Sequence, residues 1–390
     1  MRQVDLLVVG GGPSGISTAL HVQAAAPKLS MLVLEKERYP REKICAGGIG
    51  ARAFTILDKL GITVECPMVR LDALALRLGG DTIVTRQDHL GVVVRRVEFD
   101  HALARQAIAR GIEVRDGCAV ETITVDEDGV RVITAEGEEI QARAIVGADG
   151  VGGIVRRQAG FARGELRAQV VELDTEAVPQ DLPRDTVVFD FDTRELNGYT
   201  WDFPTLVNGM PLVCRGAYVI RNLGPDDARA RIAAYLTARG LDSRRYRHKQ
   251  FAERGFEPGA EISAPRVLLV GEAAGIDIAT GEGIGQAIEY GAVAGPYLAR
   301  AFAANRLHFA SWGSAVHGHH LGRQMRIRHA CYRWFFGPKR LSVERAMSRL
   351  PALFRVAVQD FAGVPMSKLA LLRGAGQFLA AVSREKMRDT

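Results

Sequence analysis

Short apolar runs, separated by a glycine-rich turn and a helical stretch, characterise the first part of the chain. Residues 4–9 are nearly all apolar, which is typical of a strand buried in a parallel sheet. Residues 14–26 can continue as a helix, and residues 30–34 form a second apolar run. This order predicts a strand, helix and strand unit, and therefore a fold of the α/β class, at the N-terminus.

A different pattern begins near residue 161. Between residues 161 and 261, segments such as 186–191 and 212–218 alternate in the way expected of antiparallel strands. The helical stretch 225–240 interrupts them, and residues 311–390 have the pattern of helices. The whole chain is therefore predicted to be α+β, with an antiparallel-sheet region and a C-terminal helical region beside the α/β part.

The composition allows a large core and excludes a membrane-spanning protein. Of the 390 residues, 47% are hydrophobic and 25% charged, so two or more coupled lobes are expected. Residues 6–27 contain no Asp, Glu, Lys or Arg, but the glycines between Gly10 and Gly15 would break a single helix. We therefore expect neither a signal peptide nor a membrane span there.

The cysteines point away from metal and disulfide chemistry. They are Cys45, Cys66, Cys118, Cys214 and Cys331. No C-x-x-C pair is present that could hold zinc, an iron–sulfur cluster or a redox disulfide. We expect no metal site and a reduced, cytoplasmic setting.

The net charge of +6 is concentrated in one segment. Residues 321–350 contain eight Arg and Lys residues and the single acid Glu344, a local charge of +7, so the rest of the chain has a net charge of −1. A general affinity for nucleic acid is therefore not expected. Basic residues around residues 334–336 (Trp-Phe-Phe) are compatible with peripheral contact to the inner face of a membrane, and equally with a solvated helical cap.

The first candidate site is the turn after residues 4–9, which has the pattern Gly10-x-Gly12-x-x-Gly15. Such glycines allow a tight turn, a close approach to a pyrophosphate and packing of helix on strand, while the helix N-terminus offers free N–H groups to the anion. Glu35 follows twenty residues after Gly15, at the end of the second strand, where a carboxylate accepts hydrogen bonds from a ribose. The unit predicts dinucleotide binding.

Three later segments resemble flavoproteins with the p-hydroxybenzoate-hydroxylase fold. Residues 145–156, which contain Asp149 and Gly150, resemble the G-A-D-G-x-x-S-x-V-R element, with Gly153 in the place of Ser. Residues 96–100 are similar to the R-x-x-F-D segment, whose Arg approaches the flavin. Residues 267–284 resemble the third element, with Glu272 where Asp is usual. The resemblance implies a Rossmann-like FAD-binding domain and FAD as the cofactor.

Two further segments resemble the geranylgeranyl reductase family. Residues 39–48 are similar to its Y-P-R-x-K-x-C-G-G-G segment, with Ala46 in place of the first Gly, and in that family the segment runs beside the isoalloxazine. Residues 198–204 resemble its Y-x-W-x-F-P segment, which lines the substrate cavity and here contains Tyr199, Trp201 and Phe203. An ordinary core strand is the alternative interpretation of the latter segment.

These patterns assign domains and site residues. The FAD-binding domain is predicted to comprise residues 1–70, 97–160 and 262–310, the substrate domain residues 71–96 and 161–261, and the helical region residues 311–390. The predicted cofactor residues are Gly10, Gly12, Pro13, Ser14, Gly15, Glu35, Lys36, Arg41, Cys45, Ala46, Gly47, Arg96, Asp149, Gly150, Gly271, Glu272, Gly281, Gly283 and Ile284.

The resemblance implies an FAD-dependent reductase that adds hydrogen across carbon–carbon double bonds of a hydrophobic, polyprenyl-like substrate. Cys45 is the candidate proton donor, because it is the motif residue expected to lose a proton near neutrality; a small buried residue shaping the cavity is the alternative. No second dinucleotide turn occurs in the sequence, so NADH, NADPH or a ferredoxin-like protein is expected to dock transiently as electron donor.

Other functions share these features. A monooxygenase that hydroxylates or epoxidises a hydrophobic metabolite needs no diagnostic side chain and stays open. Halogenases carry a W-x-W-x-I-P segment and an early catalytic lysine, whereas this chain has no lysine between Lys59 and Lys249. A disulfide reductase would need a close cysteine pair. A non-catalytic flavin or lipid carrier is the remaining class.

Overall fold

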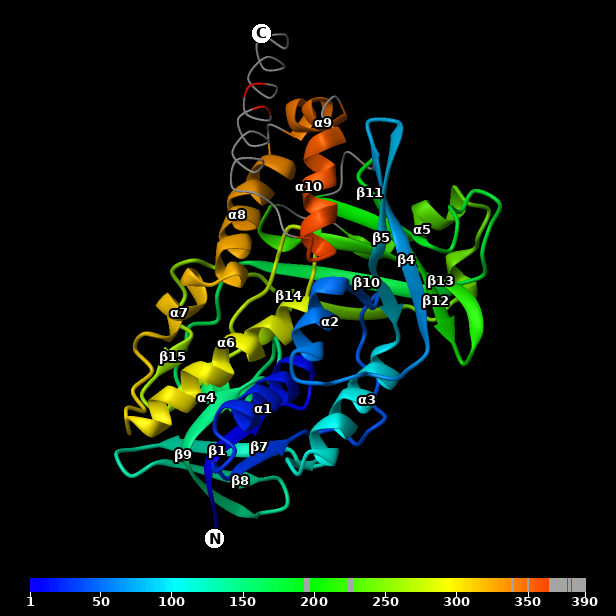
Figure 1. The fold of residues 1–390 in the computed structure, drawn as a ribbon. Coiled ribbons are helices and arrows are strands. Elements are labelled where there is room, and N and C mark those ends of the chain that lie inside the picture. Colours follow the sequence, from blue (N-terminus) through cyan, green and yellow to red (C-terminus); the bar gives the residue numbers. More distant parts are fainter. Residues whose placement is uncertain are drawn as a thin grey trace.

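Two large sheets lie side by side in the computed structural model, with helices over their faces and a group of C-terminal helices at one end (Figure 1). The structure describes residues 1–192, 197–223, 227–337, 340–348 and 351–364, and the single positions 377 and 380. The predicted combination of an α/β part with an antiparallel sheet and C-terminal helices is confirmed.

The first sheet is parallel at its centre. In spatial order its parallel strands are β16 (Val267–Leu269), β9 (Glu139–Gly147), β1 (Arg2–Val9), β2 (Met31–Leu34) and β6 (Glu113–Arg115). Two strands, β7 (Val120–Val125) and β8 (Val130–Thr134), extend it through antiparallel pairing of β8 with β9, and β15 (Ser263–Ala264) pairs with β16. The predicted strand at residues 4–9 is thus the centre of this sheet.

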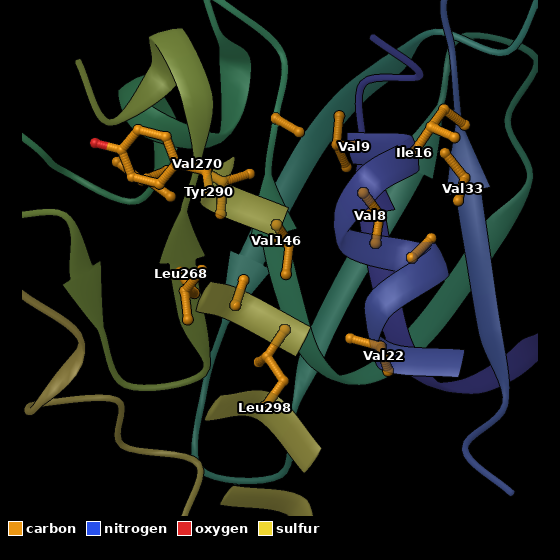
Figure 2. Packing of buried hydrophobic residues seen from close by; sticks show 14 of the residues in the cluster. Val8, Val9, Ile16, Val22, Val33, Val146, Leu268, Val270, Tyr290 and Leu298 are labelled. Carbon is orange, nitrogen blue, oxygen red and sulfur yellow. The ribbon is translucent and has the colours of Figure 1, made fainter. Parts of the chain in front are cut away.

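Two long helices cover one face of this sheet and touch each other. Helix α1 (Pro13–Ala25) and helix α6 (Ile284–Ala303) approach so closely that a Cβ at Gly291 would lie 2.3 Å from the Ser17 Oγ. The same Ser17 hydroxyl donates to the Ile288 carbonyl at 2.8 Å. Figure 2 shows their apolar side chains against those of β1, β2, β9 and β16. This packing aligns the N-termini of both helices at the same end of the sheet.

Of three shorter helices, the second and third connect a strand of one sheet with a strand of the other. They are α2 (Ala51–Asp58), α3 (Arg96–Ala109) and α4 (Ile154–Gln158). The short strand β3 (Gly48–Gly50), which follows β2, pairs with β5 of the second sheet. The chain therefore enters the second sheet before it has completed the first.

The second sheet has eight strands. In spatial order they are β14 (Lys249–Arg254), β10 (Arg167–Thr175), β13 (Met210–Ile220), β12 (Gly198–Val207), β11 (Thr186–Asp190), β4 (Met68–Leu78), β5 (Asp81–Val94) and β3. All neighbours are antiparallel except β11 and β4, which are parallel. The predicted alternating segments at residues 186–191 and 212–218 lie in β11 and β13.

One face of the second sheet is covered by α5 (Ala228–Thr237). Arg215 is fully buried on this face and binds the carboxylates of Asp181 and Asp202, each at 2.7 Å. Tyr235 of α5 donates to Asp202 at 2.8 Å, so the charge is paired and the helix is attached. The first residues of the predicted helix 225–240 lie outside the described part of the chain.

The other face looks toward the first sheet and the C-terminal helices. These are α7 (Trp312–Gly318), α8 (His320–Phe335), α9 (Arg340–Ser348) and α10 (Pro351–Phe361). Helix α10 packs against β5 and α2. Figure 1 shows the β4–β5 hairpin beside α9 and α10. None of the described helices is both long and apolar enough to span a bilayer.

The predicted basic segment 321–350 is divided in the structure. Arg328 of α8 is partly buried, with 18% of its side chain exposed, and ion-paired, and Arg340 binds Glu344 at 2.6 Å. Arg323 and Arg326 are exposed on α8. Lys339 and Arg349 lie outside the described residues. Contact of this segment with a membrane therefore stays a prediction. Fewer of its basic side chains are available for such contact than the count from the sequence suggested.

Candidate functional site

A cavity of about 1150 Å³ runs from the glycine turns of the first sheet to the facing side of the second. Its walls come from β1, β2 and β9 of the first sheet, from β4 and β10 to β14 of the second sheet, and from α8 and α10. The three predicted glycine-rich segments, near residues 10, 149 and 281, all line it although they are far apart in the sequence. The cavity is large enough for a dinucleotide together with part of a second ligand.

The first wall is the turn between β1 and α1. Gly10 has φ +108°, and a Cβ there would lie 2.3 Å from the Ala148 carbonyl oxygen, so only glycine fits. Gly12 precedes α1 and no side chain caps the helix, which leaves its first N–H groups directed into the cavity beside Pro13 and Ser14. A Cβ at Gly12 would meet no atom closer than 3.6 Å. The turn is shaped for an anion.

A carboxylate closes the other side of this turn. Glu35 follows β2, is 5% exposed and accepts a hydrogen bond from the Gly11 N–H at 2.9 Å. Arg41 bridges it to Asp100, at 3.2 Å from Glu35 and 3.1 Å from Asp100. Lys36, beside Glu35, is exposed but also lines the cavity. Glu35 thus lies at the end of β2 beside the glycine turn, where the sequence placed it.

The second wall follows β9. Asp149 is buried, and its Oδ2 accepts a hydrogen bond from the Val155 N–H at 2.9 Å. Burial raises the pKa of Asp149 to about 6, and its Oδ1 has no protein hydrogen-bond partner in the described part of the chain. A Cβ at Gly153 would lie 2.3 Å from this oxygen. Gly150 continues the wall with φ +79°.

The third wall is the loop between β16 and α6. Gly281 has φ +67°, and Gly283 precedes α6, whose N-terminus also lacks a side-chain cap. Glu272 lies 3.9 Å from Lys43; burial raises the pKa of its carboxyl, and Lys43 opposes this rise. Ile284 begins α6 and lines the cavity. The N-termini of α1 and α6 thus face one space, which suits a pyrophosphate.

The segment 41–48 crosses between the two sheets. A Cβ at Gly47 would lie 1.8 Å from the Val94 carbonyl oxygen, so the segment is held against β5. Cys45 and Ala46, which directly precede this contact, line the cavity. Arg96 lies at the same place and forms a bidentate ion pair with Asp100, at 2.6 and 2.7 Å.

The expectation that Cys45 ionises near neutrality is wrong. Burial raises the pKa of the Cys45 thiol, and the nearby Arg96 guanidinium offsets the rise only in part. The thiol is therefore neutral at physiological pH. Carboxyls titrate closer to neutrality: burial raises the pKa of Glu172, whose carboxylate accepts from the Cys45 N–H, to about 7.

Two predicted cofactor residues do not line the cavity. A Cβ at Gly15 would lie 1.9 Å from the Gly10 carbonyl oxygen, so this glycine allows α1 to pack on the turn. Gly271 has φ +59°, and a Cβ there would lie 2.5 Å from the Ser14 Oγ. Both glycines support the walls from behind. The structure brings the remaining predicted cofactor residues to one cavity.

The far end of the cavity is aromatic. Tyr199, Trp201 and Phe203 alternate along β12, and all three line the cavity. Phe189 of β11 packs against the rings of Tyr199 and Phe203, each at 5.3 Å between ring centroids. Phe354 and Val358 of α10 close this end from the opposite side. A hydrophobic ligand could therefore be enclosed here.

Sequence reasoning missed several ionisable residues of the cavity, among them Glu253, Tyr218 and Arg328. Glu253 and Tyr218 lie on the sheet face, and Arg328 reaches the Gly281 loop from α8, at 2.9 Å from Asp277 and 2.6 Å from Glu282. None of them belongs to a recognised motif. The alternation of β14, with Phe251 and Glu253 on one face, was the only available signal.

Comparison with known proteins finds relatives over most of the chain. Residues 3–195 match the family model described as FAD binding domain. An uncharacterized protein of Methanosarcina barkeri is 27% identical over 365 residues, covering 90% of this chain and 88% of that protein. Digeranylgeranylglycerophospholipid reductase 2 of Methanothermobacter thermautotrophicus is 26% identical over 329 residues, covering 78% of this chain and 80% of that protein.

Other similarities are confined to one part or to the fold. Rifampicin monooxygenase of Streptomyces venezuelae is 33% identical over 168 residues, which is 40% of this chain and 34% of that protein. A solved geranylgeranyl bacteriochlorophyll reductase-like protein from Thermoplasma acidophilum has a TM-score of 0.70 at 20% identity, and covers 99% of this chain and 98% of its own. At that identity the similarity concerns the fold.

Proposed function

Since this chain is an FAD-dependent oxidoreductase of the p-hydroxybenzoate-hydroxylase fold, in the superfamily of geranylgeranyl reductases and flavin monooxygenases, we propose that it reduces carbon–carbon double bonds of a hydrophobic, polyprenyl-like substrate. The observation that carries the proposal is the continuity of the glycine-walled flavin site with an apolar and aromatic sheet face. A long unsaturated chain could lie on that face with one double bond at the flavin end.

The site fits FAD. The uncapped N-termini of α1 and α6 would hold the pyrophosphate, and Glu35 the adenosine ribose. The free Oδ1 of Asp149 and the carboxyl of Glu272 would accept from hydroxyls of the cofactor. When bound and reduced, FAD supplies the hydride.

The chain's own residues have three tasks in this proposal. The rings of Tyr199, Trp201 and Phe203 hold the substrate and exclude water. The segment containing Cys45 lines the cavity between the glycine turns and the sheet face. A proton must reach the second carbon of the double bond, so a neutral acid in the cavity is required. NADH, NADPH or a ferredoxin-like protein is proposed as the transient donor.

One experiment separates this function from its rivals. The purified protein is loaded with FAD, reduced chemically without air and given a panel of polyprenyl lipids, and products are analysed by mass spectrometry. A product that gains two hydrogens while the flavin reoxidises supports the reductase. A product that gains oxygen after air is admitted indicates a monooxygenase, which the similarity of part of the chain to rifampicin monooxygenase favours as the second candidate. Flavin that no lipid reoxidises indicates a carrier.

A further inference from the structure

The sheet face that lines the cavity carries one acid. Because side chains alternate along each strand, residues from six strands point to the cavity together. Apart from Glu253, the described side chains that these strands present to the cavity are apolar or aromatic. They are Leu71, Leu74, Leu76, Val170, Val187, Phe189, Tyr199, Trp201, Phe203, Tyr218 and Phe251. A carboxyl in such a surface is costly unless it is needed or fully bonded.

Glu253 is tied to the flavin end of this face. It is 5% exposed, and its Oε1 accepts a hydrogen bond from the Tyr218 hydroxyl at 2.8 Å. Tyr218 stacks on Tyr199, its cross-strand partner, with ring centroids 5.0 Å apart. The Tyr199 hydroxyl in turn donates to the Thr280 carbonyl at 2.5 Å, immediately before Gly281. Two aromatic rings therefore connect the acid to the glycine loop of the flavin site.

The surroundings of Glu253 favour its neutral form. Burial raises the pKa of this carboxyl well above its usual value, and the carboxylates of Glu272 and Asp277 raise it further. The Tyr218 hydroxyl and the Lys43 ammonium act in the opposite direction. The neighbouring Tyr199 and Tyr218 are themselves neutral, because burial raises the pKa of both phenols. Glu253 thus carries a proton that it can donate into the cavity.

We propose that Glu253 is the proton donor of the double-bond reduction and that Tyr218 is the residue that positions it. This inference rests on the proposed function. The O–H bond of Glu253 breaks and its proton forms a C–H bond with one alkene carbon, while hydride from reduced FAD adds to the other carbon. The alkene is reduced, FAD is oxidised, and the Glu253 carboxylate regains a proton from water before the next turnover.

Glu253 suits this task better than Cys45. Burial raises the pKa of both groups. An unperturbed carboxyl is a stronger acid than an unperturbed thiol, so the rise gives Glu253 the protonated form that a general acid needs, whereas it makes an already weakly acidic thiol a poorer proton donor. Both groups line the same cavity. Cys45 can then serve the shape of the site, which is the alternative that its burial favours.

The test compares Glu253→Gln with Tyr218→Phe in the FAD-loaded full chain, with Glu165→Gln as a matched control on an exposed carboxyl. Glutamine keeps the acceptor for Tyr218 but has no acidic proton. We expect unchanged FAD affinity and unchanged reduction by dithionite. The maximal rate at which the alkene reoxidises the reduced flavin should fall about a hundredfold or more. The alkene concentration that gives half of the maximal rate should stay unchanged. Glu165→Gln should behave as wild type.

Infrared spectroscopy gives a readout that does not need turnover. In the difference spectrum between wild type and Glu253→Gln at pH 7, the C=O stretch of one protonated, buried carboxyl should appear, whereas the bands of Asp149 and Glu172 should cancel. The same band should be shifted in Tyr218→Phe, which lacks the hydrogen bond. The reoxidation rate should fall at alkaline pH, as Glu253 loses its proton. In Tyr218→Phe this alkaline limb should move to higher pH, because the hydroxyl no longer stabilises the carboxylate.

The outcomes are separable. Wild-type protein that reduces no alkene refutes the proposed function itself. An active wild type with an equally active Glu253→Gln refutes the role of Glu253 alone, as does a Glu253 band that shows an ionised carboxylate at pH 7. If Glu253→Gln does not fold, the pH limb of Tyr218→Phe decides, and an unmoved limb overturns the proposal.

Discussion

The flavin half and the substrate half of the cavity are built by different means. Around the flavin site the shape depends on the absence of side chains: a Cβ at Gly10, Gly15 or Gly47 would lie within 2.3 Å of a carbonyl oxygen. On the substrate side the shape depends on large side chains such as Tyr199 and Trp201, which fill a sheet face by alternation. Backbone geometry thus governs one half, and side-chain packing the other.

Ion pairs join the two halves. Arg328 of α8 binds Asp277 and Glu282 in the loop of the flavin half, and Asp360 of α10 at 3.5 Å. Arg52 of α2 binds the same Asp360 at 2.7 Å. The helices that close the substrate end are therefore attached to the loop that shapes the flavin end. The comparison of the two halves predicts that breaking this junction costs more than altering either wall.

The largest effect is expected for Arg328→Met. Removing the guanidinium leaves the buried Asp277 and the partly buried Glu282 without their shared cation and takes one partner from Asp360, which should destabilise the protein by about 3–5 kcal/mol. Chemical denaturation of the FAD-loaded protein measures this. Arg326→Met, two residues earlier on the exposed side of the same helix, is the control and should change stability by less than about 0.5 kcal/mol. Equal effects of both substitutions would show that the ion pairs of Arg328 do not stabilise the junction between the two halves.

Gly10→Ala should follow, at about 3 kcal/mol or more, because the new Cβ combines a disfavoured φ with a clash against the Ala148 carbonyl. Gly160→Ala separates the two causes. Gly160 has φ +81° but no atom within 4 Å of a Cβ, so its substitution should cost only about 1 kcal/mol. Thermal unfolding and bound flavin per chain are measured together. A Gly10→Ala protein with normal flavin content would refute the close-packed turn.

A smaller, pH-dependent effect is expected at the junction. His320 binds Glu289 at 3.1 Å and Asp360 at 3.2 Å. Hydrogen bonds to Asp360 and Glu289 raise the pKa of His320 to about 9. Since the pKa is about 6.5 in an unfolded chain, the protonated ring stabilises the fold fully below pH 6.5, and this contribution is lost as the pH rises toward 9.

The loss over this range should be about 2 kcal/mol after allowance for partial exposure. It is measured as the change in unfolding free energy between pH 6 and pH 9. His320→Gln should remove this dependence, while the control His308→Gln, at an exposed position, should keep it. A wild-type protein that is equally stable at both pH values would exclude the charged His320 bridge.

The smallest change in stability is expected for Gly12→Ala. Its φ is −76° and a Cβ there meets nothing closer than 3.6 Å, so the free energy of unfolding of the apoprotein should fall by less than about 1 kcal/mol. The methyl group would, however, occupy the approach to the α1 N-terminus. FAD affinity, measured by fluorescence titration, should fall about tenfold or more. Unchanged affinity would place the pyrophosphate elsewhere.

The flavin half could be predicted well from the sequence because its determinants are local. The strand, the glycine turn and the helix between residues 2 and 25 are adjacent in the chain, and Glu35 follows at a characteristic distance. The order of the three glycine-rich segments indicated FAD, and the match of residues 3–195 to an FAD binding domain agrees. The alternation of β12 similarly indicated that Tyr199, Trp201 and Phe203 share one face.

Only the tertiary structure placed Tyr218, Glu253 and Arg328 in the cavity, beside the ionisable residues that the motifs predicted. Tyr218 and Glu253 are 35 residues apart, and Arg328 and Asp277 are 51 apart; each pair meets through strand order or helix packing that no local pattern specifies. The direction of the pKa shift at Cys45 likewise depends on burial by distant segments. Backbone turns are encoded by neighbouring residues, whereas the charge and burial of a site are properties of the assembled fold.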